Sequence, residues 1–374
     1  MPRCSNVLRV PPSVERILVI RLGALGDVVR TLPAVAGLRA LLPESHISWL
    51  VEPASAGLVA LSPAVDDVLV FPRPELVRDL RSGRVDRMAR LLVERVGSLR
   101  AARFDLVVDF HGLLKSGLLA RSTGAALRVG AARPHSREGS GRLMSHRAEL
   151  GPAKRSRYER NAGIAGFLGA GIPDATDEII AVPRAATDRI TERLGGERPG
   201  VVLHPGSSPG TPYKRWAPER FAALARTLAD ETGTPCLVTS GPGDSEPRLA
   251  REIVAASDGA ARLAPATGDL AELAALLARA PLVVGGDSGP LHLAALLGTP
   301  VVQILGPTDP IENAPFAATP KRVVREAVPC SPCRRGCGDP ICMQAVSVEQ
   351  VARAARSLLG VREAARTSPP WRAA

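Results

Sequence analysis

Residues 281–310, PLVVGGDSGPLHLAALLGTPVVQILGPTDP, carry the clearest signal of the fold. Residues 282–284 and 301–305 are apolar runs typical of buried strands, and residues 292–297 between them are typical of a short helix. A glycine-containing turn joins the first strand to the helix. This order of strand, helix and strand is that of a βαβ unit, which predicts parallel neighbouring strands.

The turn in this stretch brings together residues that favour a bound anion: Asp287, Ser288, Gly289 and, in the helix, His292. A strand that ends at small residues and passes into a helix leaves backbone N–H groups and a helix N-terminus available to a phosphate. For this stretch alone, an ordinary βαβ unit in which Gly and Pro only form turns is an equal alternative. The polar side chains in an otherwise apolar run favour the anion site.

Strands and helices alternate in the same way through most of the chain. Further strands are expected at 17–20, 46–51, 68–71, 104–110, 200–204 and 235–239, and further helices at 74–102, from 113, at 218–231, 270–280 and 347–359. This alternation predicts an α/β protein with parallel, doubly wound sheets. The alternation restarts after the proline-rich and charged residues 171–199, so we expect two Rossmann-like domains that face a ligand-binding cleft.

The expected domain boundaries follow from that restart. An N-terminal Rossmann-like domain covers residues 1–175, and a linker covers 176–199. A C-terminal Rossmann-like domain covers 200–345, with a cysteine-rich insert at 330–342, and a C-terminal helix and tail cover 346–374.

The formal net charge of +11 is confined to residues 72–160, which hold 20 Lys and Arg against 9 Asp and Glu. Such a localised positive charge suits a nucleic acid, an anionic membrane surface or a phosphorylated lipid. A solvated arginine-rich surface without a partner is the alternative. Aromatic residues make up only 3% of the chain, which argues against stacking on nucleobases and therefore against nucleic acid.

The sequence predicts a cytoplasmic protein. Its apolar runs are shorter than the about 18 residues that a transmembrane helix needs. The N-terminal residues 1–16 also lack the apolar core of a signal peptide.

Residues 17–42 place Gly23, Gly26 and Asp27 where the first strand passes into a helix. Asp27 has two interpretations. It is either an N-cap that stabilises the helix by about 1 kcal/mol, or a functional carboxylate at the C-terminal edge of the strand, where open α/β sheets bind ligands. The spacing G-x-x-G-D differs from the dinucleotide fingerprint G-x-G-x-x-G, which disfavours a nicotinamide cofactor.

Two basic residues, Lys115 and Arg121, follow the strand at 104–110 and are placed to meet an anion at the same sheet edge. Residues 131–160 are basic and interrupted by Gly and Ser, so we expect a long loop with irregular pieces. Long loops on compact domains are usually functional or mobile.

Cys330, Cys333, Cys337 and Cys342 have the spacing C-x2-C-x3-C-x4-C. Four clustered cysteines in a cytoplasmic chain can hold zinc or an iron–sulfur cluster. Zinc sites more often use two C-x2-C pairs separated by a longer loop, so reduced structural thiols are the favoured interpretation and no metal is expected.

Four segments, in this order, resemble the ADP-heptose:lipopolysaccharide heptosyltransferases of glycosyltransferase family 9. They are RLGALGD at 21–27, HPGSS with KRW at 204–216, GDSGPLH at 286–292 and LGPTDP at 305–310. The resemblance covers residues 16–360, and the four-cysteine segment is similar to one in the heptosyltransferase II branch. It implies the GT-B fold, with two facing Rossmann-like domains and a final helix that crosses back towards the first.

The resemblance also implies roles for individual residues. Asp27 matches the catalytic aspartate that takes the proton of the acceptor hydroxyl. Gly26, Lys115, Arg121 and Arg137 are implied to bind the acceptor, the lipid A–Kdo core. The implied donor-binding residues for ADP-heptose are Ser207, Ser208, Lys214, Glu246, Asp287, Ser288, Gly289 and His292.

The implied activity is inverting transfer of heptose from ADP-heptose to Kdo or heptose of the lipopolysaccharide inner core, without a required cofactor. The implied place is the cytoplasmic face of the inner membrane, on its anionic surface. Another GT-B enzyme, either a different nucleotide-sugar transferase or a nucleotide-sugar epimerase, is the alternative. A non-enzymatic basic module that binds nucleic acid or membrane is a third hypothesis, and the sequence does not indicate an oligomeric state.

Overall fold

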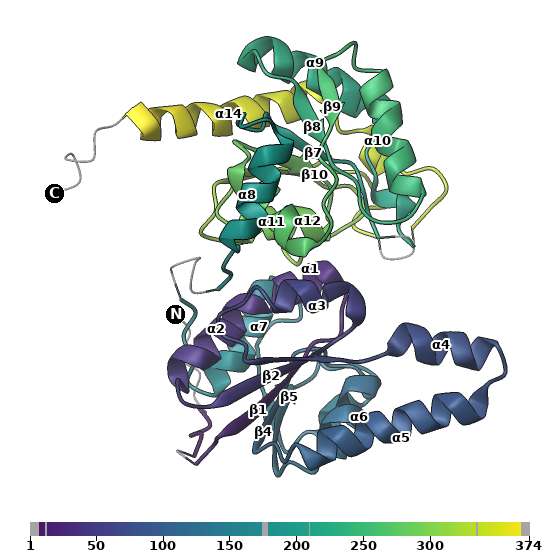
Figure 1. Cartoon of the computed structure of the whole chain (residues 1–374), viewed down its shortest axis with the longest axis vertical. Helices are drawn as coiled ribbons and strands as arrows, with labels where there is room; N and C mark the ends of the chain where they lie inside the picture. Colours follow the sequence, from purple (N-terminus) through teal and green to yellow (C-terminus); the bar gives the residue numbers. More distant parts are fainter. Residues whose placement is uncertain (1–6, 12, 174–178, 209, 334–335, 368–374) are drawn as a thin grey trace. The chain divides into compact units, whose positions relative to one another are not determined.

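The computed structural model describes residues 7–11, 13–173, 179–208, 210–333 and 336–367 (Figure 1). The chain divides into unit 1, Met1–Ala181, and unit 2, Val182–Ala374. Each unit has one six-stranded parallel sheet surrounded by helices. None of the helices in the described part of the chain is both long and apolar enough to cross a membrane.

Unit 1 begins with β1 and its sheet has the order β3-β2-β1-β4-β5-β6. Its strands are β1 (Arg16–Ile20), β2 (His46–Val51), β3 (Asp67–Val70), β4 (Leu106–Asp109), β5 (Leu127–Ala131) and β6 (His146–Ala148). Its helices are α1 (Leu25–Val29), α2 (Leu32–Leu41), α3 (Pro53–Val59), α4 (Arg73–Arg81), α5 (Val85–Ala101), α6 (Leu114–Ser122), the 3-10 turn η1 (Ser140–Leu143) and α7 (Arg157–Phe167).

Unit 2 repeats this plan, with the sheet order β12-β11-β10-β7-β8-β9. Its strands are β7 (Val202–His204), β8 (Cys236–Val238), β9 (Ala261–Leu263), β10 (Val283–Gly285), β11 (Val301–Ile304) and β12 (Lys321–Val324). Its helices are α8 (Arg184–Arg193), the 3-10 turn η2 (Pro212–Lys214), α9 (Pro218–Thr232), α10 (Ser245–Ala255), α11 (Leu270–Arg279), α12 (Gly289–Leu296), α13 (Ile341–Gln344) and α14 (Val348–Thr367).

Both sheets reverse their strand order at one point, which is where doubly wound proteins bind ligands. In unit 1 the reversal lies between β1 and β4, where Ile17 pairs with Leu106. In unit 2 it lies between β7 and β10, where Val202 pairs with Val283. The predicted fold class, α/β with two doubly wound parallel sheets, is confirmed.

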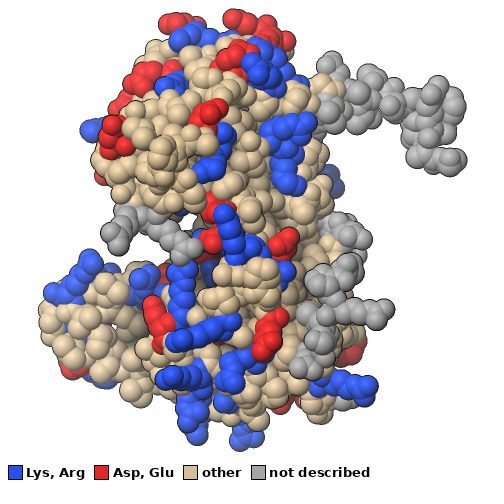
Figure 2. All heavy atoms as spheres, turned by 180° about the vertical axis from the view of Figure 1, so that it is seen from behind, with Lys and Arg blue, Asp and Glu red and all other residues tan. Residues whose placement is uncertain are grey.

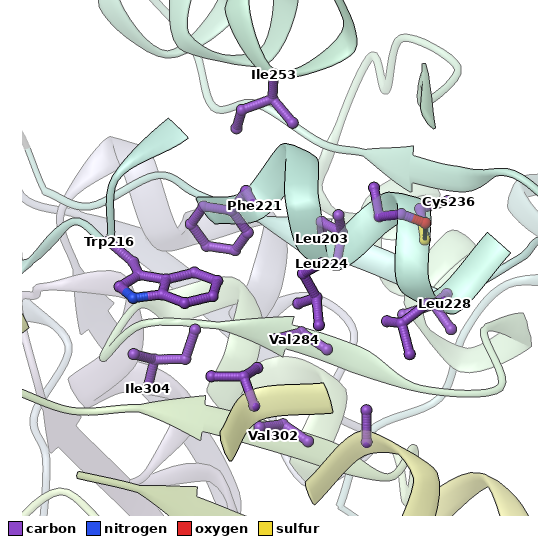
Figure 3. Close-up of a cluster of buried hydrophobic side chains, with 14 of the residues drawn as sticks. Leu203, Trp216, Phe221, Leu224, Leu228, Cys236, Ile253, Val284, Val302 and Ile304 are labelled. Atoms are coloured by element: carbon purple, nitrogen blue, oxygen red, sulfur yellow. Dashed lines mark hydrogen bonds between the residues drawn. The ribbon is translucent and has the colours of Figure 1, made fainter. Parts of the chain in front are cut away.

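The central strands are buried on both faces, as parallel sheets require. Four successive residues of β1, Ile17 to Ile20, are fully buried, which explains why the strand is a continuous apolar run. In unit 2, Trp216 meets Phe221 edge to face at 5.1 Å between ring centroids, inside the cluster shown in Figure 3. The helix α14 packs on α9, β11 and β12 of the same unit.

Two local predictions in unit 1 were wrong. The helix expected at 74–102 is two helices, because Gly83 adopts a left-handed conformation, φ 70°, between α4 and α5. These helices form a hairpin that projects from the sheet (Figure 1). The loop expected at 131–160 contains η1, β6 and the start of α7. Short edge strands such as β6, with two exposed residues of three, lack the apolar run that marks a central strand.

Candidate functional site

A cavity of about 410 Å³ lies in unit 1 at the C-terminal ends of β1 and β4, where the strand order reverses. Six of the lining side chains are Lys or Arg and two are carboxylates. The lining residues are Arg21, Gly23, Ala24, Asp27, Glu52, Arg73, His111, Gly112, Leu113, Lys115, His135, Arg137, Arg157 and Arg160. This composition favours a ligand with several negative charges.

Asp27 lies in the first turn of α1, but it is not the N-cap. The N-cap is Ala24, without a side-chain capping bond, so the capping interpretation of Asp27 is wrong. The Asp27 carboxylate instead contacts three guanidinium groups: Arg21 Nη2 at 2.6 Å, Arg157 Nη1 at 2.6 Å and Arg30 Nη1 at 3.3 Å. Its side chain is 19% exposed, so one carboxylate is held inside the cavity wall by three cations.

The charges around Asp27 determine its ionisation. Burial alone would raise the pKa of this carboxyl, but the positive charges of Arg21, Arg157 and Arg30 outweigh burial and hold the pKa well below its ordinary value. The carboxylate is therefore ionised throughout the physiological range. Its fixed position and permanent charge distinguish it from a base whose pKa lies near neutrality.

A buried carboxylate also forms the turn that presents His111. Asp109, at the end of β4, accepts hydrogen bonds from the backbone N–H groups of His111, at 2.9 Å, and Gly112, at 3.2 Å, and from Ser116 Oγ at 2.9 Å. Gly112 has φ 69°, which allows the chain to turn there. The end of β4 and the turn that follows it therefore place His111 in the wall of the cavity.

His111 is a neutral polar group in this cavity. Neither ring nitrogen has a hydrogen-bond partner among the described residues, although both atoms are buried. Burial, followed by the positive charges of Arg21 and Lys115, lowers the pKa of His111 to about 3. A neutral imidazole can donate or accept one hydrogen bond, which suits a ligand hydroxyl.

Of the four residues predicted to bind the acceptor, Lys115 and Arg137 line the cavity and Gly26 and Arg121 do not. Arg121 is exposed in the last turn of α6. The roles of all four stay predictions. Lys115 Nζ lies 3.8 Å from Glu52 Oε1, a residue that the sequence analysis missed although it directly follows the strand β2.

Sequence reasoning also missed the cations that α7 and β1 bring to the cavity. Arg157 and Arg160 lie on α7, 130 residues or more from Asp27 along the chain, so local patterns could not place them. Arg21 directly follows β1, and its Nη1 donates to Phe110 O at 2.7 Å. Its position at the end of a central strand was the available signal.

In unit 2, the reversal between β7 and β10 gathers several of the predicted donor-binding residues. Asp287, which follows β10, joins two of them: its Oδ2 lies 3.0 Å from Lys214 Nζ and its Oδ1 lies 3.1 Å from His292 Nε2. His292 is fully buried in α12. Asp287 therefore positions both the lysine and the histidine, a contact pattern that the sequence did not predict.

The serine residues predicted in this region differ in their surroundings. Ser288 is the N-cap of α12, next to Gly289, and its buried hydroxyl has no hydrogen-bond partner among the described residues. An unpaired hydroxyl at a helix N-terminus is suited to an anion. Ser207 Oγ already donates to Thr211 O and accepts from Arg215 Nε, each at 3.0 Å, whereas Ser208 is exposed.

Glu246 lies in the first turn of α10 and packs on two glycines. Its Oε2 accepts a hydrogen bond from Gly241 N at 2.6 Å. A Cβ atom added at Gly206 would lie 2.4 Å from the same oxygen, so the approach of this carboxylate to the loop after β7 requires glycine. The arrangement presents a fixed carboxylate, which suits hydroxyl groups of a ligand.

The clustered cysteines are free thiols, and the burial of Cys342 raises its pKa. In the described part of the chain, no group of three His, Cys, Asp or Glu side chains is placed to hold a metal ion. Residues 334–335 of this segment lie outside the described residues.

Residues 94–338 match the model of glycosyltransferase family 9 (heptosyltransferase). The chain is 30% identical over 329 residues to lipopolysaccharide heptosyltransferase 1 of Pseudomonas aeruginosa, covering 85% of this chain and 86% of that protein. The solved structure of E. coli ADP-heptose lps heptosyltransferase II has a TM-score of 0.71 at 22% identity, covering 93% of this chain and 99% of that one. E. coli heptosyltransferase WaaC with ADP has a TM-score of 0.72 at 21% identity, covering 92% and 99%. The two six-stranded sheets are those of the GT-B fold.

Proposed function

The chain belongs to glycosyltransferase family 9 and is therefore a glycosyltransferase, and on that premise we propose that it transfers heptose from ADP-heptose to the lipopolysaccharide inner core. The transfer inverts the configuration at the anomeric carbon. The acceptor oxygen forms the new glycosidic bond, the bond from the anomeric carbon to the diphosphate breaks, and ADP leaves with the electron pair.

Asp27 is the proposed proton acceptor. The observation that supports this role is an ionised carboxylate inside a cation-lined cavity at the end of the first strand. A hydroxyl becomes strongly acidic as its oxygen bonds to the anomeric carbon, so even a weakly basic carboxylate can take the proton at that stage. The contribution of Asp27 is then mainly its position.

The acceptor proposed for this cavity is the lipid A–Kdo core, whose phosphate and carboxylate groups suit the excess of cations. Lys115 and Arg137 are proposed to bind these anionic groups, and the neutral His111 to bind a sugar hydroxyl. Charge-assisted hydrogen bonds of this kind are stronger than neutral ones and fix orientation. Because the acceptor is a lipid, we place the enzyme at the cytoplasmic face of the inner membrane.

The donor proposed for unit 2 is ADP-heptose. Lys214, which forms an ion pair with Asp287, is proposed to neutralise the leaving diphosphate. The unpaired Ser288 hydroxyl is proposed to donate a hydrogen bond to the same diphosphate. Glu246 is proposed to accept from the ribose hydroxyls. Gly289, His292, Ser207 and Ser208 complete the proposed donor site, which needs no resident cofactor in this proposal.

Purified protein incubated with ADP-heptose and defined core acceptors tests the proposal. Mass spectrometry should show an acceptor heavier by one heptose, and ADP should be released only when the acceptor is present. Acceptors that end in Kdo or in heptose identify the position that is modified. Isomerisation of the sugar nucleotide without acceptor, or transfer only from another sugar nucleotide, would contradict the proposal.

A further inference from the structure

The α4–α5 hairpin, residues 73–101, stands out from unit 1 and packs little against it (Figure 1). Its base is anchored, because Leu99 is buried in the core and Leu76 packs against the same cluster. Its turn is held by Asp79, which is 1% exposed and lies 3.0 Å from Arg84 Nη2 and 3.5 Å from Arg87 Nε. The hairpin is thus an internally braced arm.

One face of α5 on this arm is apolar and exposed. Val85, Ala89, Leu92 and Val93, here called the apolar stripe, follow the i, i+4, i+7, i+8 spacing of one helix face. Val93 is 71% exposed and Val85 is 54% exposed, although valine is usually buried. At about 1.5 Å per residue, the stripe runs for about 12 Å along the helix. Leu80, at the end of α4, adds a further exposed apolar side chain near the turn.

Arginines flank the apolar stripe. The hairpin carries eight Arg and four acidic residues. Two of the acids, Asp79 and Asp86, are paired with arginines of the hairpin itself. Arg81, Arg95 and Arg100 are exposed. In Figure 2 the hairpin is the lobe at the lower left, where a tan surface is bordered by blue side chains.

We propose that the α4–α5 hairpin docks on the surface of a lipid bilayer with anionic headgroups. The apolar stripe enters the boundary between headgroups and acyl chains, and the flanking arginines bind the lipid phosphates. A helix with an apolar face and an arginine-rich polar face lies in such an interface. Apolar contact and positive charge are both needed, because neither alone gives firm binding to a membrane.

The combination of an apolar stripe with flanking arginines favours a lipid bilayer over other partners. A nucleic acid would satisfy the arginines but would offer nothing to Val85, Leu92 and Val93. A second copy of the chain could cover the apolar stripe, but it would bring the same arginines into mutual repulsion. The inference rests on the proposed function only for the identity of the membrane, the one that holds the acceptor.

Vesicle flotation with the full-length protein tests the proposal. Vesicles of phosphatidylcholine alone are compared with vesicles of equal parts phosphatidylglycerol and phosphatidylcholine. We expect binding to the anionic vesicles, weakened by salt. The double variant V85E/V93E should reduce this binding by at least about tenfold, because each substitution places a charge in the interface. The variant R81Q/R95Q should reduce it by about fivefold per arginine on the anionic vesicles.

The matched control is I311E in unit 2, where Ile311 is 50% exposed and lies outside the hairpin. It should bind vesicles as the wild type does. Transfer to a soluble acceptor without acyl chains should be the same for the wild type and all these variants, because none of the altered residues lines the cavity. Vesicle binding without any heptose transfer would refute the proposed function and leave the docking inference intact.

Three results would overturn the docking inference. One is failure of the wild type to bind anionic vesicles while it transfers heptose to the soluble acceptor. Another is an equal loss of binding in I311E and V85E/V93E. The last is a change from dimer to monomer in V85E/V93E, measured by analytical ultracentrifugation, with vesicle binding unchanged.

Discussion

Replacing Asp27 by Asn removes one negative charge from the best-defined cluster of the cavity while keeping the size of the side chain. The carboxylate contacts Arg21 and Arg157 at 2.6 Å and Arg30 at 3.3 Å. Arg21 and Arg30 are only 5% exposed, so their charges lose their partner in a place that water barely reaches. Breaking a buried ion pair on one side typically costs about 3–5 kcal/mol.

We expect the lower end of that range, about 3 kcal/mol, because Arg21 keeps its hydrogen bond to Phe110 O. Urea unfolding of D27N, followed by circular dichroism, measures the change. Sulfate should restore stability to D27N more than to the wild type, because an anion can replace the missing carboxylate among the arginines.

The variant D86N is the matched control. Asp86 pairs with Arg90 at 2.7 Å, but both side chains are more than 70% exposed, so the unfolding midpoint should hardly move. Equal midpoints for D27N and the wild type would refute the buried ion cluster. Equal effects of D27N and D86N would do the same.

Three further predictions concern single side chains. His111→Gln should remove a group that makes the folded protein less stable in acid. The pKa of His111 is lowered from 6.5 to about 3 in the folded chain, so between these two pH values the unfolded chain binds one more proton. Wild-type stability therefore falls as the pH drops below 6.5. Relative to the wild type, the unfolding free energy of H111Q should therefore rise by up to about 2 kcal/mol from pH 7 to pH 5 in urea titrations, and a constant difference would contradict it. Lys214→Gln should weaken ADP binding by about tenfold or more in isothermal titration, because a charged hydrogen bond to phosphate is lost, and unchanged affinity would exclude the assigned contact. Arg137→Gln should raise the KM for the acceptor by about tenfold and leave kcat nearly unchanged, because Arg137 lines the cavity. Arg121 is exposed outside the cavity, so Arg121→Gln should change neither KM nor kcat. The reverse pattern in steady-state kinetics would assign the acceptor contact to Arg121.

Most central strands of the two sheets could be predicted, because a strand that is buried on both faces is a continuous apolar run in the sequence. The run Ile17 to Ile20 and the run around Val283 are continuous and apolar, and each ends at a glycine-containing turn. The central strand β5 and the edge strands β6, β9 and β12 were missed, because polar residues such as Arg128, Arg147 and Arg322 interrupt their apolar pattern and make them resemble loops. The difference reflects burial, the property that the hydrophobic pattern measures.

Arg21 and Glu52 directly follow β1 and β2 and were nevertheless missed. The residues that could be predicted lie in the turn, or in the first turn of the helix, after a central strand. Asp27 and Asp287 are of this kind, and both lie at the points where the strand order reverses. The arginines that fix Asp27 were not predictable, because Arg157 reaches it from α7 by tertiary contact alone. The capping interpretation of Asp27 failed because the helix begins earlier than the glycine pattern indicates: Ala24 is the N-cap, so Asp27 lies inside the first turn, where its carboxylate contacts three cations.

The most direct test of the central claim compares the wild type with D27N under conditions where both are folded. Each protein is incubated with ADP-heptose and a Kdo-terminated core acceptor, and product is measured by mass spectrometry while ADP affinity is measured by calorimetry. We predict one added heptose for the wild type, none for D27N, and equal ADP affinity for the two. Transfer by D27N at the wild-type rate would contradict the role of Asp27 as the proton acceptor.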